Sequence, residues 1–437
     1  MHSVHPSLGS SWLLRAAVAA LCTSPFFALP SYAATDDLRA QIEMLRAEQA
    51  RIAELQRQTD EKLRALEGKL GVVAGPATAS TTQPSAPAET LATAADAKSH
   101  LNVSGDMRLR YQGDYSDADM PDRHSSQVRA RLGATYAVND RVTVGARLVT
   151  GDPDDPNSTD VQLSNFNDDL DVSLDLAYGQ VNFGDLKLYG GKIPQPFART
   201  DLVWDSDVNP QGVSAMYKRP LADGSALRAN SLFFVVDENA VAADSTMVGG
   251  QLGYDSAAFG GWKFDASAAY YDYRLGSVAG GDAGDFRSNL RNPDGSYRSD
   301  FDLADLLIGA TWSGAGERWP VRVLGDYVHN FGAATDADTG YGIDLVLGRA
   351  SKPSDWRLTY GYSVAETDSV LAAFSHDNIG IGTNYKLHAL TLDYVPWPRT
   401  VINAIWYHYA PYHAVDAGAN DPNDWLDRLR VAFVVSF

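Results

Sequence analysis

Cysteine is almost absent from this chain of 437 residues, in which Cys22 is the only one. Cys22 lies in an apolar amino-terminal segment and follows Leu21, where a lipoprotein signal would carry a small residue, so we predict no lipid anchor. Without that segment the chain has no cysteine and its stability cannot depend on disulfides. This absence favours a large fold over a small disulfide-bonded domain.

Long apolar runs and basic residues are also scarce. After the first 35 residues there is no apolar run of about 18 residues, which argues against a helical membrane protein. Lysine and arginine number 36 against 55 acidic residues, a formal net charge of -19, so we expect no nucleic-acid partner. Tyrosine, tryptophan, glycine and aspartate are plentiful, which favours strands, turns and aromatic belts.

The amino-terminal segment has the pattern of a secretory signal peptide. Arg15 ends a weakly charged region, Ala16 to Leu29 is apolar, and Ser31 and Ala33 are small residues at the two cleavage positions. We therefore predict a signal peptide over residues 1–33 and export of the rest of the chain.

Residues 34–70 have the composition and periodicity of a coiled coil. Apolar and small polar residues alternate at spacings of four and three, which is a heptad seam, at Leu38, Ile42, Leu45, Gln49, Ile52, Gln56, Thr59, Leu63, Leu66 and Leu70. We predict a periplasmic oligomeric helix here, with a lone amphipathic helix as the alternative. Residues 71–99 are rich in Ala, Thr, Pro and Ser and predict a flexible linker, with a domain boundary near His100.

The segment from Gln127 to Thr150 predicts a β-hairpin with one apolar and one polar face. Val128, Leu132 and their alternate neighbours share one face, and arginines share the other. Asn139-Asp140 supplies the turn. In a soluble sandwich the polar face would meet water, whereas in an outer-membrane barrel the apolar face would meet lipid.

Alternating segments of this kind recur to the end of the chain, and we count about sixteen strands. Their short connections lie near Asn139, Gly184, Pro220, Phe259, Gly314, Lys352 and Pro396. Their longer, polar connections lie near Asp117, Asp155, Asp205, Asn239, Asp285, Thr335, Ser369 and Asp416. Short periplasmic turns that alternate with long external loops are typical of outer-membrane barrels. Residues 100–437 therefore predict an all-β, antiparallel transmembrane β-barrel.

The last strand and one internal segment carry a family resemblance. Leu429, Val431, Phe433, Val435 and Phe437 alternate and finish in an aromatic terminus, and in this the chain resembles the Gram-negative porins. The coiled coil and the segment from Gly190 to Gly212 resemble the family of "putative porins" related to phosphate-selective porins. The resemblance implies a homotrimer of water-filled barrels in the outer membrane, in contact with its lipid, and recognition of the Phe437 strand by the barrel-assembly machinery.

Seven arginines share the parity of the polar face and are predicted to line the pore: Arg108, Arg110, Arg129, Arg131, Arg147, Arg428 and Arg430. Barrel closure should place Arg428 and Arg430 beside Arg108 and Arg110. Such a patch would concentrate anions, because guanidinium groups stay charged. The alternative is that the arginines are partners of the lumenal acids Asp106, Asp171 and Asp175.

The third long connection, residues 194–211, is the candidate constriction loop. It carries Asp201, Trp204, Asp205 and Asp207. The resemblance implies that this loop folds into the lumen, where its carboxylates would face the arginines. A solvated surface loop and a calcium site are the alternatives.

We expect no enzyme, cofactor or resident metal. The histidines show no metal-ligand spacing, and no G-x-S-x-G nucleophile motif is present. The sequence instead predicts a porin for passive diffusion of small hydrophilic solutes and ions. One alternative is a pore selective for phosphate or a similar anion, and another is a structural tether that reaches the cell wall through the coiled coil.

Overall fold

The computed structural model describes Arg57 and residues 100–116, 121–164, 169–240, 242–276, 286–413 and 424–437. All of these except Arg57 belong to the compact unit Thr90–Phe437. The signal peptide, coiled coil and linker predicted for residues 1–99 lie outside the described residues. Within the described residues, no helix is long and apolar enough to cross a membrane.

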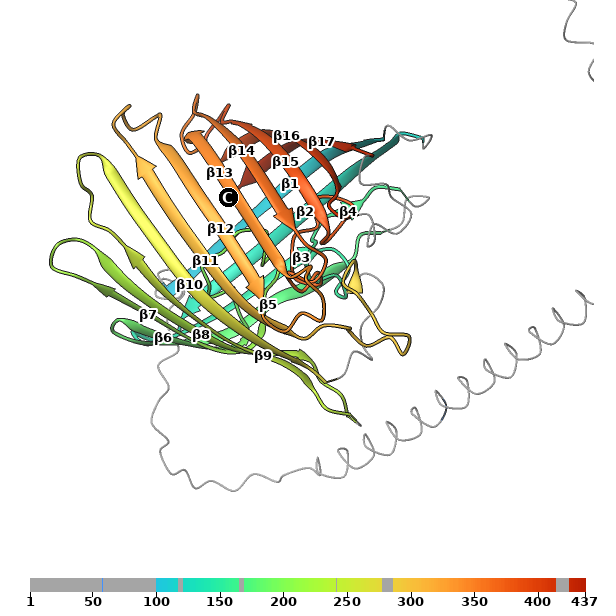
Figure 1. The fold of residues 1–437 in the computed structure, drawn as a ribbon. Helices are drawn as coiled ribbons and strands as arrows, with labels where there is room; N and C mark the ends of the chain where they lie inside the picture. Colours follow the sequence, from blue (N-terminus) through green and yellow to red (C-terminus); the bar gives the residue numbers. More distant parts are fainter. Residues whose placement is uncertain are drawn as a thin grey trace, which may run out of the picture. The chain divides into compact units, whose positions relative to one another are not determined.

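The described residues form one antiparallel sheet that closes on itself (Figure 1). Its strands are β1 (Leu101–Ser116), β2 (Arg123–Ala137), β3 (Val142–Thr150), β4 (Val161–Gln162), β5 (Val172–Phe183), β6 (Leu186–Lys192), β7 (Gln211–Pro220), β8 (Ala226–Asp237), β9 (Ser245–Asp255), β10 (Trp262–Leu275), β11 (Phe301–Trp312), β12 (Val321–Asn330), β13 (Thr339–Gly348), β14 (Trp356–Ala365), β15 (Tyr385–Tyr394), β16 (Thr400–Pro411) and β17 (Leu426–Ser436).

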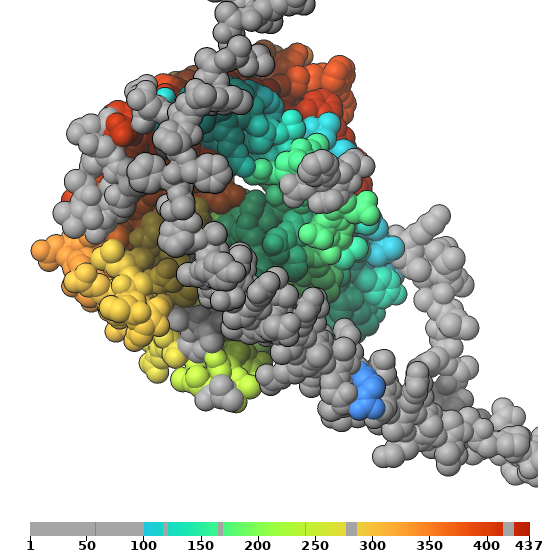
Figure 2. All heavy atoms as spheres, turned by 90° about the vertical axis from the view of Figure 1, so that its right-hand side faces the viewer, coloured from blue at the N-terminus to red at the C-terminus, as the bar shows by residue number. Residues whose placement is uncertain are grey.

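Sixteen of these strands make the barrel wall, and β4 is a two-residue addition. β1 pairs with both β2 and β17, so the sheet has no free edge at its ends. Figure 2 shows the same closure, because the colours run around a central hollow from cyan through yellow to red. Phe437 exchanges two backbone hydrogen bonds with Gly105 of β1, which fixes the carboxyl terminus to the first strand. The predicted barrel of about sixteen strands is confirmed.

The two faces of the wall have opposite polarity. Leu109 and Leu132 are 47% and 49% exposed on the outside, whereas Arg110 and Arg129, at positions of the opposite parity in the same strands, are 9% and 7% exposed. A wall with apolar residues outside and polar residues inside suits lipid on one side and a polar lumen on the other. The apolar face of the predicted hairpin is therefore the outer one.

Two details depart from regular strands. Asp175 has no partner in the ladder between β3 and β5, and the register shifts at Arg147 and Leu148. β15 begins only at Tyr385, because the preceding Thr383 and Asn384 are buried in the connection, where Thr383 donates to the carbonyl of Thr367.

Four connections at the long-loop end matter for the lumen. We name them L2 (residues 151–160), L3 (residues 193–210), L5 (residues 286–300) and L7 (residues 366–384). L3 and L7 contain most of the fully buried residues that do not belong to a strand, among them Ile193, Trp204, Val370 and Ala372. The buried residues of these loops pack against the inner faces of wall strands between β8 and β16, and together they form the core.

Candidate functional site in the barrel lumen

The arginines of β1 and β2 lie on the inner wall and are paired with carboxylates. Arg129 and Arg131 both bind Asp106 of β1, each at 2.7 Å between nitrogen and oxygen. Arg108 and Arg110 both contact the carboxylate of Asp160, which belongs to L2. Burial removes water from these charged groups, and the attraction between each arginine and its carboxylate offsets part of that cost.

The other three predicted arginines have different neighbours. Arg147 is paired with Asp175, as one of the two sequence interpretations expected, and Arg428 is paired with Asp114. Arg430 donates to the side-chain oxygens of Gln112 at 2.8 Å and Asn378 at 3.0 Å. Within the described residues, Arg430 is the only one of the seven without a carboxylate partner.

Arg430 lies diagonally beside Arg110, two residues away in register. Arg430 lies opposite Gln112 and Arg428 opposite Asp114, whereas Arg110 lies opposite Ala432. Alternation predicts which face a side chain occupies, but it does not set the register between the first and last strands.

L3 leaves and rejoins the wall at two glycines that face each other. Gly191, the last residue but one of β6, has a φ of 117°, and its ladder partner Gly212, the second residue of β7, has a φ of 149°. Both backbones lie where a side chain is strained. The two glycines therefore allow the chain to turn from the wall into the lumen at one point.

L3 is attached to opposite sides of the barrel. Thr200 hydrogen bonds to Asp326 of β12, and Asp207 binds Arg131 of β2 at 3.1 Å. β2 and β12 lie roughly half a turn apart in the order of wall strands. A loop that reaches both strands crosses the interior.

Trp204 fixes the middle of L3 by apolar packing. Its side chain is fully buried and lies 5.6 Å from the ring of Tyr271 in β10 and 5.6 Å from the stacked ring of Phe374 in L7, measured between centroids. Phe234 of β8 and Tyr273 of β10 complete this aromatic cluster. Trp204, which was predicted to lie in the constriction loop, therefore anchors L3 to the described core.

The three aspartates of L3 occupy three different environments. Only Asp207 contacts the arginines, and it also accepts a hydrogen bond from Thr159 of L2 at 3.0 Å. Asp205 is 4% exposed and accepts from the backbone N–H of Asp207 at 2.7 Å. Asp201 points away from them and accepts from the amide of Asn378 at 3.1 Å. The expectation that all these carboxylates face the arginine wall was therefore wrong for Asp201 and Asp205.

L7 is a second inward loop, although the long connection near Ser369 was predicted to be external. The backbone N–H of Asp205 donates to Phe374 at 2.7 Å, and the N–H of His376 donates to Asp201 at 3.1 Å, so L3 and L7 are joined through their backbones. L5 holds L7 from the other side, since Asn289 donates to the carbonyls of Thr367 and Val370. L2 adds a bond from Asn157 to the carbonyl of Ser375.

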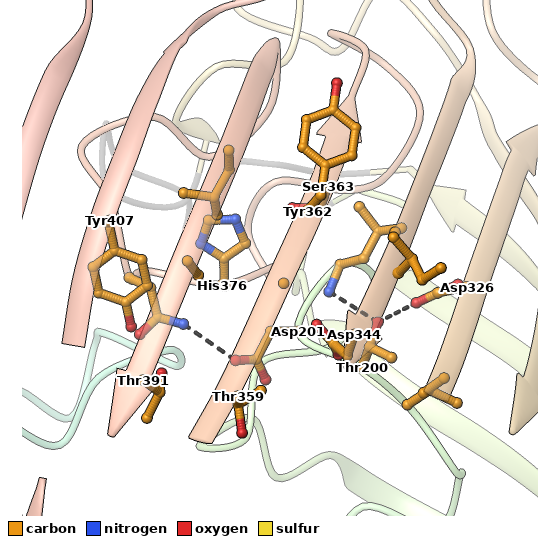
Figure 3. A pocket seen from close by; sticks show the side chains of 18 of the residues that line it. Thr200, Asp201, Asp326, Asp344, Thr359, Tyr362, Ser363, His376, Thr391 and Tyr407 are labelled. Carbon is orange, nitrogen blue, oxygen red and sulfur yellow. Dashed lines mark hydrogen bonds between the residues drawn. The ribbon is translucent and has the colours of Figure 1, made fainter. Parts of the chain in front are cut away.

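A cavity of about 340 Å³ lies between these loops and the inner faces of β12 to β16 (Figure 3). Asp201, Asp326 and Asp344 contribute carboxylates to its lining, and Thr359 and Thr391 contribute hydroxyls. A second cavity of about 370 Å³ lies between L2, L3 and L7 and is lined by Asp154, Asp237 and Phe374 among others. The lumen is therefore narrowed by loops and retains polar space.

Two buried loop groups have shifted protonation equilibria. Burial, and next the charge of Asp201, raise the pKa of Asp205 to about 9. Burial, followed by the charges of Arg287, Arg430 and Arg428, lowers the pKa of His376 to about 3. At neutral pH both side chains are therefore uncharged.

The sequence held a signal for the inward loop L7, which we did not predict, but none for Asp160. The run from Val370 to Phe374, VLAAF, is apolar in a connection of a type that is otherwise polar. Asp160 has no such signal, because its partners Arg108 and Arg110 lie about 50 residues away in the sequence. For the described histidines and acids, no group of three lies close enough to hold a metal.

The closed wall, its apolar exterior and its inward loops define an outer-membrane barrel of the porin type. Residues 115–282 match the model of a protein family described as "Putative porin", and this match confirms the porin resemblance drawn from the sequence. The match covers 168 of the 437 residues and supports an outer-membrane channel, a class of protein that is not enzymatic. The link to phosphate-selective porins stays a prediction.

Solved structures with a similar fold are also outer-membrane proteins. OprB of Pseudomonas putida is 10% identical with a TM-score of 0.53, over 78% of this chain and 95% of its own. OmpF of Salmonella typhi is 13% identical with a TM-score of 0.49, over 77% of this chain and 97% of its own. OmpT of Vibrio cholerae, described as a trimer, is 13% identical with a TM-score of 0.46, over 77% and 100%. A search of curated proteins finds no match.

Proposed function

We propose that the chain forms a water-filled channel for passive diffusion of small hydrophilic solutes and ions. The observation that supports this most is L3, which is bonded to β2 through Asp207 and to β12 through Thr200 and so narrows a closed barrel. An arginine-rich wall on one side of this narrowing faces Asp207 of the loop. The channel needs no cofactor and carries out no covalent chemistry.

The pairing of the arginines favours a general pore over an anion-selective one. Six of the seven predicted arginines have a carboxylate partner, and Arg430 is 3% exposed between Gln112 and Asn378. The four arginines of β1 and β2 share Asp106, Asp160 and Asp207, so most of their charge is balanced and a passing anion is attracted weakly. The anion-selective alternative would need the more exposed arginines to act on solute.

Planar-bilayer recording of the folded, full-length protein tests both interpretations. We expect large ohmic steps and, in a potassium chloride gradient, a small reversal potential that added phosphate leaves unchanged. Absence of conductance from folded protein would reject the channel. A strong chloride preference that phosphate lowers would favour the anion-selective pore.

The two most exposed arginines of the set sharpen this test. The side chains of Arg131 and Arg147 are 22% and 23% exposed. A double variant, Arg131→Gln with Arg147→Gln, should change the reversal potential little if the pore is general. Arg219→Gln is the matched control, because Arg219 is 60% exposed beside a short turn and far from the lumenal loops.

We further propose that the chain assembles as a homotrimer through the heptad seam of residues 34–70, ahead of a linker over residues 71–99. Deletion of residues 36–70 should leave single-channel conductance intact and weaken the oligomer in native gels. Loss of envelope attachment in the deletion strain would instead favour the tether. We also propose that the barrel-assembly machinery recognises the last strand, which ends at Phe437.

A further inference from the structure

We propose that the cavity between L3, L7 and β12 to β16 binds a small organic cation, one that carries an ammonium group and further hydrogen-bonding groups. The proposal rests on the proposed function, since it names a class of solute for this lumen. It assigns a binding role to a part of the channel that lies apart from the arginine wall.

The cavity exists because small residues occupy the inner face of the wall. Gly342 and Gly361 take inward positions on β13 and β14, and Ala389 does so on β15. Space of about 340 Å³ is left in front of them, which lies in the range of small-molecule sites. The wall is thus hollowed at one place rather than uniformly filled.

Three carboxylates reach this space from three different elements. Asp201 comes from L3, Asp326 from β12 and Asp344 from β13. Asp201 is exposed to the lumen, and within the described residues Asp344 makes no hydrogen bond or ion pair. Arg199 is the one cationic side chain of the lining, and it also donates to the carbonyl of Ser206 at 3.3 Å. The balance of charge favours a cation over an anion.

His376 supplies a second, independent sign of a ligand. Its side chain is 3% exposed, and neither of its ring nitrogens has a hydrogen-bond partner in the part of the chain that the structure describes. The ring lies on the wall of the cavity, 4.9 Å from the ring of Tyr385 (Figure 3). A buried polar ring left without partners costs free energy, so a bound molecule that bonds to it would relieve that cost.

The arrangement suits an organic cation better than a metal ion. Among the described residues no three histidine or acidic side chains converge closely enough to hold a metal. Asp326 and Asp344 are diagonal neighbours on β12 and β13, Asp201 comes from L3 and His376 from L7, so a ligand that bonds to the carboxylates and to the ring must span several elements. An amine with hydrogen-bonding groups at both ends meets this requirement, and its N–H groups form charge-assisted bonds to carboxylates.

Isothermal titration of the full-length protein, folded in detergent micelles, tests the proposal with 1,4-diaminobutane as the probe. We expect saturable binding, with glycerol and inorganic phosphate at least about tenfold weaker. Asp344→Asn should weaken diaminobutane binding about tenfold or more. His376→Phe, which keeps the ring beside Tyr385 and removes both nitrogens, should weaken it as well. Phosphate binding as tight as diaminobutane binding would overturn the proposal.

Two further variants show whether a loss of binding is specific to this cavity and replace a variant that does not fold. Asp237→Asn removes one carboxylate from the other cavity and should leave diaminobutane binding unchanged. If this variant weakens binding as much as Asp344→Asn does, the attraction is a general effect of acidic residues and the site is rejected. If Asp344→Asn fails to fold, Gly361→Ala takes its place, because the added methyl would lie 2.6 Å from a carboxylate oxygen of Asp344 and narrow the cavity. Wild-type binding retained in this variant would count against the site.

Conductance recorded from the same preparation separates this proposal from the proposed function. Ohmic conductance without diaminobutane binding would reject the cation site and leave the channel standing. Binding without conductance would reject the channel and leave the site standing.

Discussion

The two sides of the lumen hold the same loops by different physical means. On the side of β1, β2 and β17, arginines and carboxylates form a network of ion pairs that L2 and L3 join through Asp160 and Asp207. On the side of β8 to β11, aromatic and aliphatic side chains of the wall pack against Trp204 and Phe374. One side is a charge network and the other resembles the core of a soluble protein.

The two sides should therefore control two different properties, the position of L3 in the barrel and the ion selectivity of the channel. Apolar packing is insensitive to salt and pH, so the Trp204 side sets where L3 lies in the barrel. Ion pairs cost desolvation and depend on the partners present, so the arginine side sets the field along the lumen. Changes on the two sides should therefore alter different measurements.

The largest effect is expected from Trp204→Ala. Removal of this fully buried side chain leaves a void against Tyr271 and Phe374 and should destabilise the loop core by about 4 kcal/mol. Because L3 then moves more freely, single-channel conductance should rise and become noisier, with little change in ion selectivity. Trp397→Ala, at an exposed short turn, is the control. A shift in selectivity without a change in conductance would contradict the division between the two sides.

A somewhat smaller effect is expected from Asp160→Asn, which leaves Arg108 and Arg110 without a carboxylate. The side chain of Asp160 is 4% exposed, so its loss should cost about 3 kcal/mol. The reversal potential in a salt gradient should move toward anion preference, because two guanidiniums are freed. Asp152→Asn, at an exposed residue of the same loop that lines neither cavity, should leave it unchanged. An unaltered potential in Asp160→Asn would show that these arginines do not act on permeating ions.

The smallest effect concerns Asp205 and pH. Its folded-state pKa of about 9 exceeds the ordinary 3.8, so the folded chain keeps a proton that the unfolded chain releases. Stability should therefore fall as the pH rises between about 4 and 9. Asp205→Asn removes this contribution and should raise the melting temperature at pH 8, with the difference vanishing near pH 4. A lower melting temperature for the variant at pH 8 would indicate an ionised Asp205.

Features with a period of two residues could be predicted from the sequence. The inward position of Arg110 and Arg129 and the outward position of Leu109 follow from alternation alone, once the exterior is apolar. The alternation of short and long connections gave the number of wall strands for a similar reason. These properties depend only on residues that are close in the sequence, so a short segment is enough to predict them.

Properties that join distant residues could not be predicted. The pairing of Asp160 with Arg108, and the offset that places Gln112 opposite Arg430, depend on the curvature and register of the whole barrel. L7 was missed because a long connection at this end is normally polar and external, and only the apolar run beside Phe374 indicated otherwise. The cavity arises from glycines on separate strands and has no sequence motif.

The backbone bonds between L3 and L7 also have a consequence for the order of assembly. The N–H of Asp205 and the carbonyl of Phe374 belong to loops separated by eight wall strands, β7 to β14. Contacts between such distant segments form late, because the chain between them must be ordered first. The interior should therefore close only after most of the wall exists, and a partly built barrel would be an open tube.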